Sequence, residues 1–354
     1  MQIKKLTSFL LLLVSTTLFA QTQETKDSVY YAKLAQGGTK MISVQNGKYK
    51  VFTQKIGKGK IKLLLLHGGP ANGHEYFENF PKYLKKQGIT IYYYEQLGSY
   101  YSESPLDSTA YTPNAFVEHV EEVRKALNLK NFYLLGHSWG GMLAELYAQK
   151  YQKNLKGLIL SNVPGWDFSS QKDAKIFSDS LTKLVFNTAA EDLSLKQYQP
   201  EVLDSVLSGK NLSNKTLSKT IMRQYNKILD STMTRHTYYY KEGALPEPLR
   251  RDEAHSKANT KNNPYLKKLQ LSHRKVDYKP ALLSIKTNTL LLGSAHDYMY
   301  AQGYYDMKKA MTNANVRVEI VPDGSHFAMW DDPEHYFEVL TKFIKDVEKK
   351  RFKD

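Results

Sequence analysis

The sequence contains no cysteine among its 354 residues. This absence excludes disulfide bonds, thiolate zinc sites and a cysteine nucleophile, so the hydrophobic core must stabilise the fold alone. No set of histidines and carboxylates has the spacing of metal ligands, and we therefore expect neither a metal ion nor another cofactor. Apolar residues at 41% and charged residues at 24% are ordinary values for a globular protein.

No apolar run long enough to anchor the chain in a membrane follows the N-terminal segment. Residues 1–20 combine two lysines with an apolar stretch from Leu6 to Val14 and end in Ala20, which predicts a secretory signal peptide. No cysteine follows the expected cleavage point, so a lipoprotein anchor is excluded. We expect a periplasmic or secreted protein without a stable membrane anchor, and an uncleaved N-terminal anchor is the alternative.

The chain also lacks a nucleic-acid-binding motif and any interleaving of arginine with aromatic residues, so nucleic acid is not expected as a partner. The formal net charge is +15, and it becomes +13 when Lys4 and Lys5 leave with the signal peptide. A basic surface favours anionic partners or substrates. Because the lysines are scattered over predicted helix faces, solvated side chains are the simpler interpretation.

A G-x-S-x-G motif at 136–140 stands between a predicted strand and a predicted helix. The apolar run Phe132–Leu135 precedes it, and apolar residues at helical spacing follow it as far as Tyr147. In this context the motif predicts a sharp strand–turn–helix elbow that presents Ser138 above a helix N-terminus. Glycine is expected on both sides because side chains two residues from the serine would collide in such a turn. A glycine-rich turn with an idle serine is the alternative.

Strands and helices alternate between residues 61 and 161, and the alternation resumes after residue 286. The predicted strands are 40–45, 48–56, 61–66, 89–94, 132–135, 155–160, 287–292 and 316–321, and the predicted helices are 77–86, 112–127 and 335–349. The first two strands are joined at Asn46-Gly47, a typical hairpin turn. This order predicts an α/β fold with a mostly parallel central sheet and helices on both faces.

The pattern changes between residues 164 and 280, where no clean parallel strand is visible. Lysine-rich segments of helical character occupy 172–186, 199–208 and 217–240. The region is too long for a loop, so we predict a helical cap inserted into the core. The expected organisation is a signal peptide at 1–20, a first core part at 21–163, the cap at 164–280 and a second core part at 281–354.

A serine hydroxyl becomes a nucleophile when a base removes its proton and an acid orients that base. In folds with such an elbow the chain order is serine, then aspartate or glutamate, then histidine. Asp297 and His326 follow the last two predicted strands, and the carboxyl ends of parallel strands meet at one sheet edge. We predict Ser138 as nucleophile, His326 as general base and acid, and Asp297 as the orienting acid.

Two backbone N–H groups are expected to stabilise the oxyanion, namely those of Gly69, in the loop after strand 61–66, and Trp139. Asp297 has an alternative role as a helix N-cap. Asp306 and Asp323 are rival acids, and His296 is a rival base that breaks the expected order.

Five segments together resemble the proline iminopeptidase (prolyl aminopeptidase) family of α/β-hydrolases. They are HGGPA at 67–71, YEQLGSYYS at 94–102, GHSWGGMLA at 136–144, LLLGSAHDYM at 290–299 and GSHFAMWDDPEHY at 324–336. The resemblance implies an α/β-hydrolase fold and a serine exopeptidase that removes an N-terminal residue, usually proline, from peptides beneath a helical cap. It also implies that Ser138, Asp297 and His326 match the family's catalytic triad.

The chain departs from the family pattern at several positions. The family usually has glycine where Ala71 stands, which we interpret as a small change, and aspartate where Glu95 stands, while Tyr100 and its neighbour add bulk. The resemblance also implies cap glutamates that hold the free amine of the substrate. By position, Glu242 and Glu247 are the candidates, and Glu253 is a further one.

The resulting hypothesis is an exported serine aminopeptidase that acts on short peptides and releases N-terminal proline or another small residue through an acyl-enzyme. One alternative is a carboxylesterase or amidase that uses the same triad on a small acyl substrate. Another is a binding protein whose triad is vestigial. The sequence does not determine the oligomeric state.

Overall fold

The computed structural model describes residues 32–33, 35–164, 196–199, 201–202, 205, 219–224, 245–297, 299 and 302–353. The predicted signal peptide, more than half of the predicted cap and Glu242 lie outside these residues. Within the described part of the chain, no helix combines the length and apolar character needed to cross a membrane.

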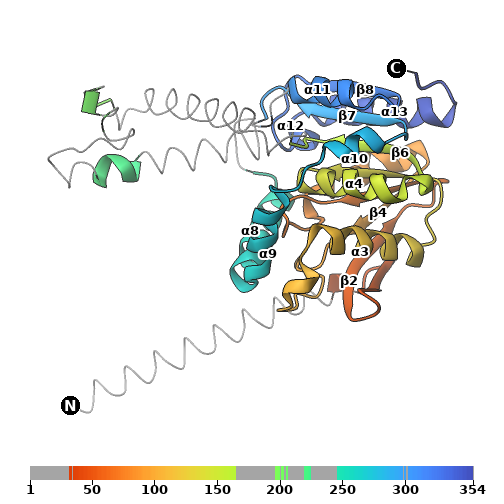
Figure 1. Cartoon of the computed structure of the whole chain (residues 1–354), viewed down its shortest axis with the longest axis horizontal. Coiled ribbons are helices and arrows are strands. Elements are labelled where there is room, and N and C mark those ends of the chain that lie inside the picture. The colour runs from red at the N-terminus through yellow and green to blue at the C-terminus, as the bar shows by residue number, and fades with distance from the viewer. Residues whose placement is uncertain are drawn as a thin grey trace, which may run out of the picture.

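An eight-stranded sheet in the order β1-β2-β4-β3-β5-β6-β7-β8 forms the centre of the described chain (Figure 1). The strands are β1 Thr39–Val44, β2 Tyr49–Ile56, β3 Ile61–Leu66, β4 Ile89–Tyr94, β5 Phe132–His137, β6 Leu155–Ser161, β7 Thr289–Ser294 and β8 Val316–Val321. β2 pairs antiparallel with both β1 and β4, and every other pairing is parallel. The predicted mostly parallel sheet is therefore confirmed.

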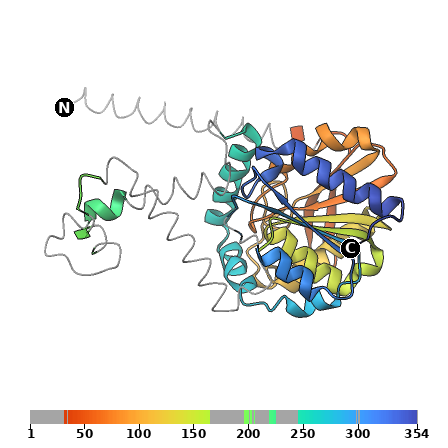
Figure 2. The same cartoon turned by 90° about the horizontal axis from the view of Figure 1, so that it is seen from above.

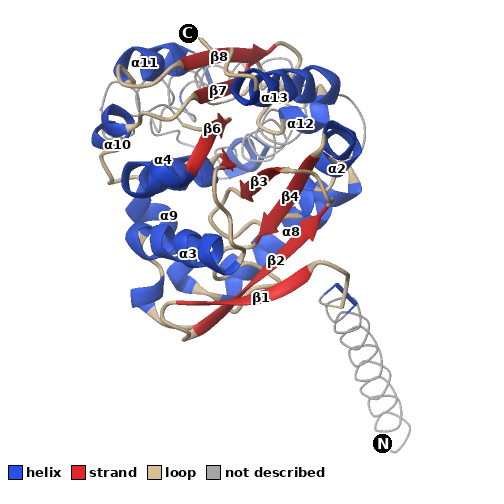
Figure 3. Ribbon diagram, turned by 90° about the vertical axis from the view of Figure 1, so that its right-hand side faces the viewer, coloured by secondary structure: helices blue, strands red, loops and turns tan. Residues whose placement is uncertain are grey.

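Helices cover both faces of the sheet, as Figure 3 shows for α3 and α4 on one side and α2 and α13 on the other. The helices are α2 Phe80–Leu84, α3 Pro113–Ala126, α4 Trp139–Tyr151, α8 Glu247–Asn262, α9 Pro264–His273, α10 Lys279–Ser284, α11 Gln302–Ala310, α12 Ala328–Asp331 and α13 Pro333–Glu348. Short 3₁₀ turns are η1 Glu75–Phe77, η2 Lys85–Gln87, η3 Ser108–Ala110 and η4 Gln152–Asn154.

The alternation of side chains along β3 shows how the two layers form. Leu64 and Leu66 pack with α3 and α4, whereas Leu63 and Leu65 pack with α2 and α13. These four leucines are fully buried, because a central parallel strand is covered on both faces. The continuous apolar run seen in the sequence is the direct result.

The predicted helix 77–86 is wrong as a single element. The chain there forms η1, then α2 from Phe80, then η2. Pro81 lies in the first turn of α2, and proline has no N–H with which to continue a helix from the preceding turn. Asn79 occupies the N-cap position instead, so α2 starts anew.

Helices α8 and α9 come from the region predicted as the cap, and they lie along one side of the core (teal in Figure 2). α8 packs against η1, just after the loop that follows β3. Asp252 of α8 accepts a hydrogen bond from the backbone N–H of Gly73 at 2.7 Å. Two segments far apart in the sequence are thereby joined beside the end of β3.

Candidate active site

Ser138 lies between β5 and α4 with φ 55° and ψ −125°, a left-handed conformation that non-glycine residues rarely adopt. A Cβ on Gly136 would lie 2.2 Å from the Gly140 carbonyl oxygen, and a Cβ on Gly140 would lie 2.1 Å from that of Leu66. Neither space accepts a side chain. The predicted strand–turn–helix elbow and its requirement for both glycines are confirmed.

The structure brings His326 and Asp297 together, although they come from the loops after β8 and β7. His326 Nδ1 lies 3.1 Å from each carboxylate oxygen of Asp297. The two side chains are 5% and 0% exposed. Because Nδ1 faces the carboxylate, it carries the proton and leaves Nε2 as an acceptor. The His326 ring lies 4.8 Å from that of His137, the neighbour of Ser138.

A chain of hydrogen bonds links the loop after β3 to the loop that carries His326. The Gly68 N–H donates to Tyr76 Oη at 2.6 Å, Tyr76 Oη–H donates to His137 Nδ1 at 3.2 Å, and His137 Nε2–H donates to the His326 carbonyl at 2.8 Å. Burial lowers the pKa of His137 well below its ordinary value, so its ring stays neutral, as this arrangement requires. The network holds the loop that carries His326 against the elbow.

Gln96 connects the two segments that supply the predicted oxyanion donors, Gly69 and Trp139. Its N–H donates to His67 Nε2 at 2.9 Å, so the other ring nitrogen, Nδ1–H, donates to the Gly68 carbonyl at 2.9 Å. Since carbonyl and N–H point in opposite directions across a trans peptide, the Gly69 N–H is turned away from the His67 ring. The Gln96 side chain donates to the His67 carbonyl at 2.7 Å and accepts from Trp139 Nε1 at 2.8 Å.

The loop after β3 approaches the elbow closely. A Cβ on Gly68 would lie 3.0 Å from Ser138 Cβ and 3.5 Å from its Oγ. Gly69 has φ +110° and Ala71 has φ +109°. The alanine is thus a larger departure than the sequence suggests, because L side chains rarely adopt this conformation. Asn259 of α8 donates to the Ala71 carbonyl at 2.8 Å and holds the strained segment.

The segment around His326 is supported by residues that sequence reasoning missed. Asp331 Oδ2 accepts from both the N–H and the hydroxyl of Ser325, each at 2.6 Å. Trp330 Nε1 donates to the Tyr76 carbonyl at 2.7 Å. The family motif at 324–336 contained these side chains, yet nothing in their spacing revealed that they brace the loop.

Asn162 is another supporting residue that the sequence did not reveal. It follows β6 with φ 47°, a conformation that asparagine tolerates. Its Nδ2 donates to Asp297 Oδ2 at 2.7 Å, to Ser294 Oγ at 2.8 Å and to the Ser325 carbonyl at 3.2 Å. This amide therefore joins the loop of Asp297 to the loop of His326. The available signal in the sequence was that Asn162, a polar residue, directly follows a buried strand.

The positions of the predicted amine-binding glutamates differ. Glu242 lies outside the described residues. Glu247 has a side chain that is 56% exposed, and it forms an ion pair with Arg251 at 2.8 Å. Glu253 pairs with Lys257 at 2.5 Å. Their role in binding an amine stays a prediction. The rival acid Asp306 is 45% exposed and lies 3.8 Å from Lys309.

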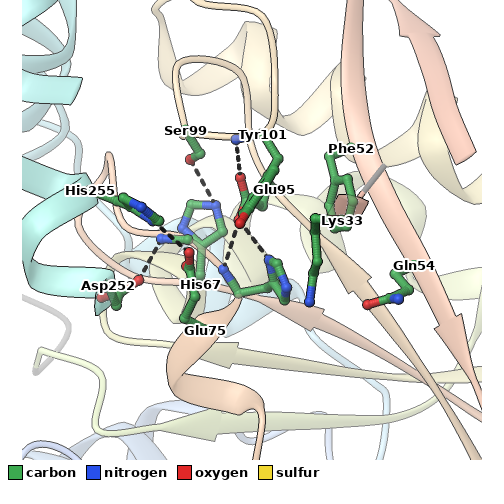
Figure 4. A network of polar contacts seen from close by, with 12 residues as sticks. Lys33, Phe52, Gln54, His67, Glu75, Glu95, Ser99, Tyr101, Asp252 and His255 are labelled. Atoms are coloured by element: carbon green, nitrogen blue, oxygen red, sulfur yellow. Dashed lines mark hydrogen bonds and ion pairs between the residues drawn. The ribbon is translucent and has the colours of Figure 1, made fainter. Parts of the chain in front are cut away.

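A second polar network lies beside the loop after β3 (Figure 4). Glu95 accepts from His74 Nδ1 at 2.6 Å and from the Tyr101 N–H at 2.7 Å. Glu75 lies 2.6 Å from His255 Nδ1. Burial raises the pKa of Glu95 and of Asp252 and lowers that of His74 to about 4. The sequence did not reveal this cluster because its members follow different strands or lie on α8.

Comparison with known proteins agrees with the geometry. A family model described as alpha/beta hydrolase fold matches residues 62–333. A proline iminopeptidase of Elizabethkingia meningoseptica is 36% identical over 322 residues, which cover 88% of this chain and 99% of the relative. One of Flavobacterium johnsoniae is 34% identical and covers 86% and 97%.

Among solved structures, the proline iminopeptidase of Mycobacterium smegmatis superposes with a TM-score of 0.68 at 19% identity, covering 88% of this chain and 99% of its own. VinJ superposes with a TM-score of 0.67 at 19% identity, covering 88% and 99%. At this identity the likeness supports the fold alone. The sequence relatives carry the assignment further, and the chain belongs to the proline iminopeptidase family of α/β-hydrolases.

Proposed function

We propose that this protein is an exported serine aminopeptidase that releases N-terminal proline, or another small residue, from short peptides. Membership of the proline iminopeptidase family supports an aminopeptidase. The observation that carries the proposal is the His326–Asp297 pair, 3.1 Å apart, beside the residue that precedes Ser138. The pair supports the proposal because a serine nucleophile requires a histidine base that a carboxylate orients.

In the proposed reaction His326 Nε2 takes the proton of the Ser138 hydroxyl while Oγ attacks the carbonyl carbon of the N-terminal residue. The oxyanion accepts hydrogen bonds from the Gly69 and Trp139 N–H groups, each worth about 3–4 kcal/mol of barrier in such sites. His326 then gives its proton to the leaving peptide amine. Water, deprotonated by His326, hydrolyses the acyl-enzyme and frees the amino acid.

The export proposal is supported by residues 1–20, whose lysines, apolar stretch and terminal Ala20 are typical of a signal peptide. Cell fractionation together with N-terminal sequencing tests it. A mature chain that begins at Gln21 in the periplasm or medium is the expected result. A full-length chain in the cytoplasm would contradict export without touching the proposed chemistry.

A panel of chromogenic substrates tests the activity. Proline and alanine p-nitroanilides with a free amine, their acetyl-blocked forms and a simple p-nitrophenyl ester are compared with the wild-type chain and Ser138→Ala. We expect free-amine proline anilide to be cleaved fastest and Ser138→Ala to lose about 10⁴-fold or more in kcat.

Two other outcomes would contradict this proposal. Turnover of blocked amides or esters, with none of the free-amine substrates, would assign a carboxylesterase or amidase. Wild-type activity no greater than that of Ser138→Ala would show that the triad is vestigial and that the chain acts by binding.

A further inference from the structure

Three carboxylates gather in the interior beside Gly73, away from the His326–Asp297 pair. Glu75, Glu95 and Asp252 are 1%, 0% and 1% exposed. One ligand atom each from His74, Glu75 and Glu95 can be chosen so that all lie within 4.8 Å of one another. We call Gly73, His74, Glu75, Glu95 and Asp252 the Gly73 cluster, and Figure 4 shows the side chains of Glu75, Glu95 and Asp252, which come from η1, the end of β4 and α8.

One carboxylate oxygen of the Gly73 cluster has no hydrogen-bond donor among the residues that the structure describes. Glu75 Oε1 is bonded to His255, but the buried Glu75 Oε2 accepts from no group in the described part of the chain. That oxygen points at the space beside the Gly73 Cα, where a Cβ would lie 2.1 Å from it and 2.8 Å from Glu95 Oε1. Two carboxylate oxygens from separate segments therefore lie close to the Gly73 Cα, and a side chain at residue 73 would collide with them.

Among the described residues, the three carboxylates of the Gly73 cluster are bonded to two histidines, His74 and His255, and to amide N–H groups. Asp252 accepts from the Gly73 N–H and from Asn72, and Glu95 accepts from His74 and Tyr101. These donors are amides and the His74 imidazole. The nearby Lys33 and Arg251 are instead bonded to Glu78. Carboxylates withdrawn from water at such low exposure require a compensating cation or proton.

We propose that the Gly73 cluster binds one divalent transition-metal cation of the zinc or manganese class, with His74, Glu75 and Glu95 as ligands and Asp252 next to them. Ligand atoms within 4.8 Å of one another can reach a single ion after small side-chain movements, since metal–ligand bonds of about 2.0–2.2 Å place ligands at most about 4.4 Å apart. An imidazole with carboxylates favours these metals, whereas Ca²⁺ requires about six to eight oxygen ligands.

Such an ion would link three segments of the chain, because its ligands come from different elements. His74 and Glu75 end the loop that contains Gly68 and Gly69, and Glu95 directly follows β4. Asp252 belongs to α8, and His255 of the same helix stacks on Tyr100 with ring centroids 3.7 Å apart. The ion would tie the loop after β3, the end of β4 and α8 to one point. It takes no part in the proposed chemistry at Ser138.

The test uses the full mature chain, stripped with a chelator and dialysed. Metal content is measured by mass spectrometry, binding of ZnCl₂, MnCl₂ and CaCl₂ by calorimetry, and stability by thermal unfolding. We expect one equivalent of zinc or manganese with a Kd below about 10 μM and a rise in Tm of about 3 °C or more. These readouts do not depend on peptidase activity, so the proposal stands or falls separately from the proposed function.

Two variants locate the ion. Glu75→Gln removes the unpartnered oxygen's charge, and Gly73→Ala places a methyl group 2.1 Å from it. Both are expected to weaken zinc or manganese binding at least tenfold, while Glu253→Gln, on α8 and paired with Lys257, keeps it. Gly73→Ala changes no charge. It therefore serves as a second variant in case Glu75→Gln fails to fold.

Three outcomes would overturn the proposal. The first is a wild-type chain that binds neither zinc nor manganese stoichiometrically, which would mean that protons neutralise the carboxylates. The second is binding that both variants leave unchanged, which would place the metal elsewhere. The third is binding of Ca²⁺ alone, which would contradict the assigned class of cation.

Discussion

Two histidine–carboxylate pairs lie at the carboxyl edge of the same sheet and differ in their surroundings. His326 and Asp297 follow β8 and β7 and are 3.1 Å apart, while His74 and Glu95 follow β3 and β4 and are 2.6 Å apart. The His326 ring adjoins the elbow of Ser138. The His74 ring is enclosed by aromatic rings of Phe52, Tyr93 and Tyr101 at 5.1, 5.1 and 5.7 Å.

The difference shows that a short bond between a histidine and a carboxylate does not by itself identify a general base. The closer pair is sealed in the interior, where burial lowers the pKa of His74 to about 4 and keeps it uncharged. The longer pair adjoins His137, the residue that precedes Ser138, and Ser138 has a strained backbone conformation. Under the proposed function, position relative to Ser138, rather than the length of the hydrogen bond, separates the two pairs.

The largest expected effect comes from replacing His326 or His74, one at a time, with glutamine. His326→Gln should lower kcat by about 10⁶-fold, because no base then takes the serine proton. His74→Gln should stay within about tenfold of the wild type in kcat. Steady-state kinetics on the preferred substrate measures both. Equal losses would erase the proposed distinction between the pairs.

The carboxylate of the His326–Asp297 pair should matter nearly as much. Asp297→Asn keeps the shape of the side chain but favours the wrong imidazole tautomer, so kcat should fall by about 10⁴-fold. Asp306→Asn, a rival position on α11 near Lys309, serves as the matched control and should leave kcat unchanged. A loss at residue 306 with none at residue 297 would reassign the acid.

The buried pair should instead affect stability. Glu95→Ala leaves the buried N–H groups of His74 and Tyr101 without acceptors, and we expect the free energy of unfolding to fall by about 3–5 kcal/mol. Urea denaturation followed by circular dichroism measures the change. Glu253→Ala, on the partly exposed face of α8, should cost less than about 1 kcal/mol. A stability change at residue 95 no larger than the control would contradict the structural role.

A buried histidine that bonds to no carboxylate among the described residues extends the comparison to pH. His119 in α3 is 1% exposed, and burial lowers its pKa to about 4, with Glu122 and Glu118 opposing the shift. In the unfolded chain His119 therefore binds a proton near pH 6.5, whereas in the folded chain it stays neutral at that pH. This contribution to stability is complete above pH 6.5 and is lost as the pH falls from about 6.5 towards 4.

Replacement of His119 by phenylalanine removes that titration. The difference between variant and wild type in the free energy of unfolding should grow by up to about 3 kcal/mol in favour of the variant between pH 7 and pH 4, following the limit of about 1.4 kcal/mol per pH unit. Urea titrations at a series of pH values measure it. A difference that stays constant with pH would show that His119 titrates normally in the fold.

Much of the core could be predicted because its signals are local. The run at 61–66 could only be a strand buried on both faces, and the elbow required glycine at 136 and 140 for steric reasons that the structure confirms. The broken helix at 75–87 was missed, because Pro81 at the second position of a helix is as compatible with a start as with an interruption. The predicted signal peptide and most of the cap concern residues that the structure does not describe.

The sequence by itself determined the order of the strands and helices, the elbow and the placement of Asp297 and His326 at strand ends, since each depends on residues close together in the chain. Only the tertiary structure decided which side chains brace them. Asn162 reaches Asp297 and Asp252 reaches Gly73 across more than a hundred residues. Such contacts depend on burial, because a polar group that is removed from water forms its hydrogen bonds within the protein. No local sequence pattern indicates which residue will be the partner.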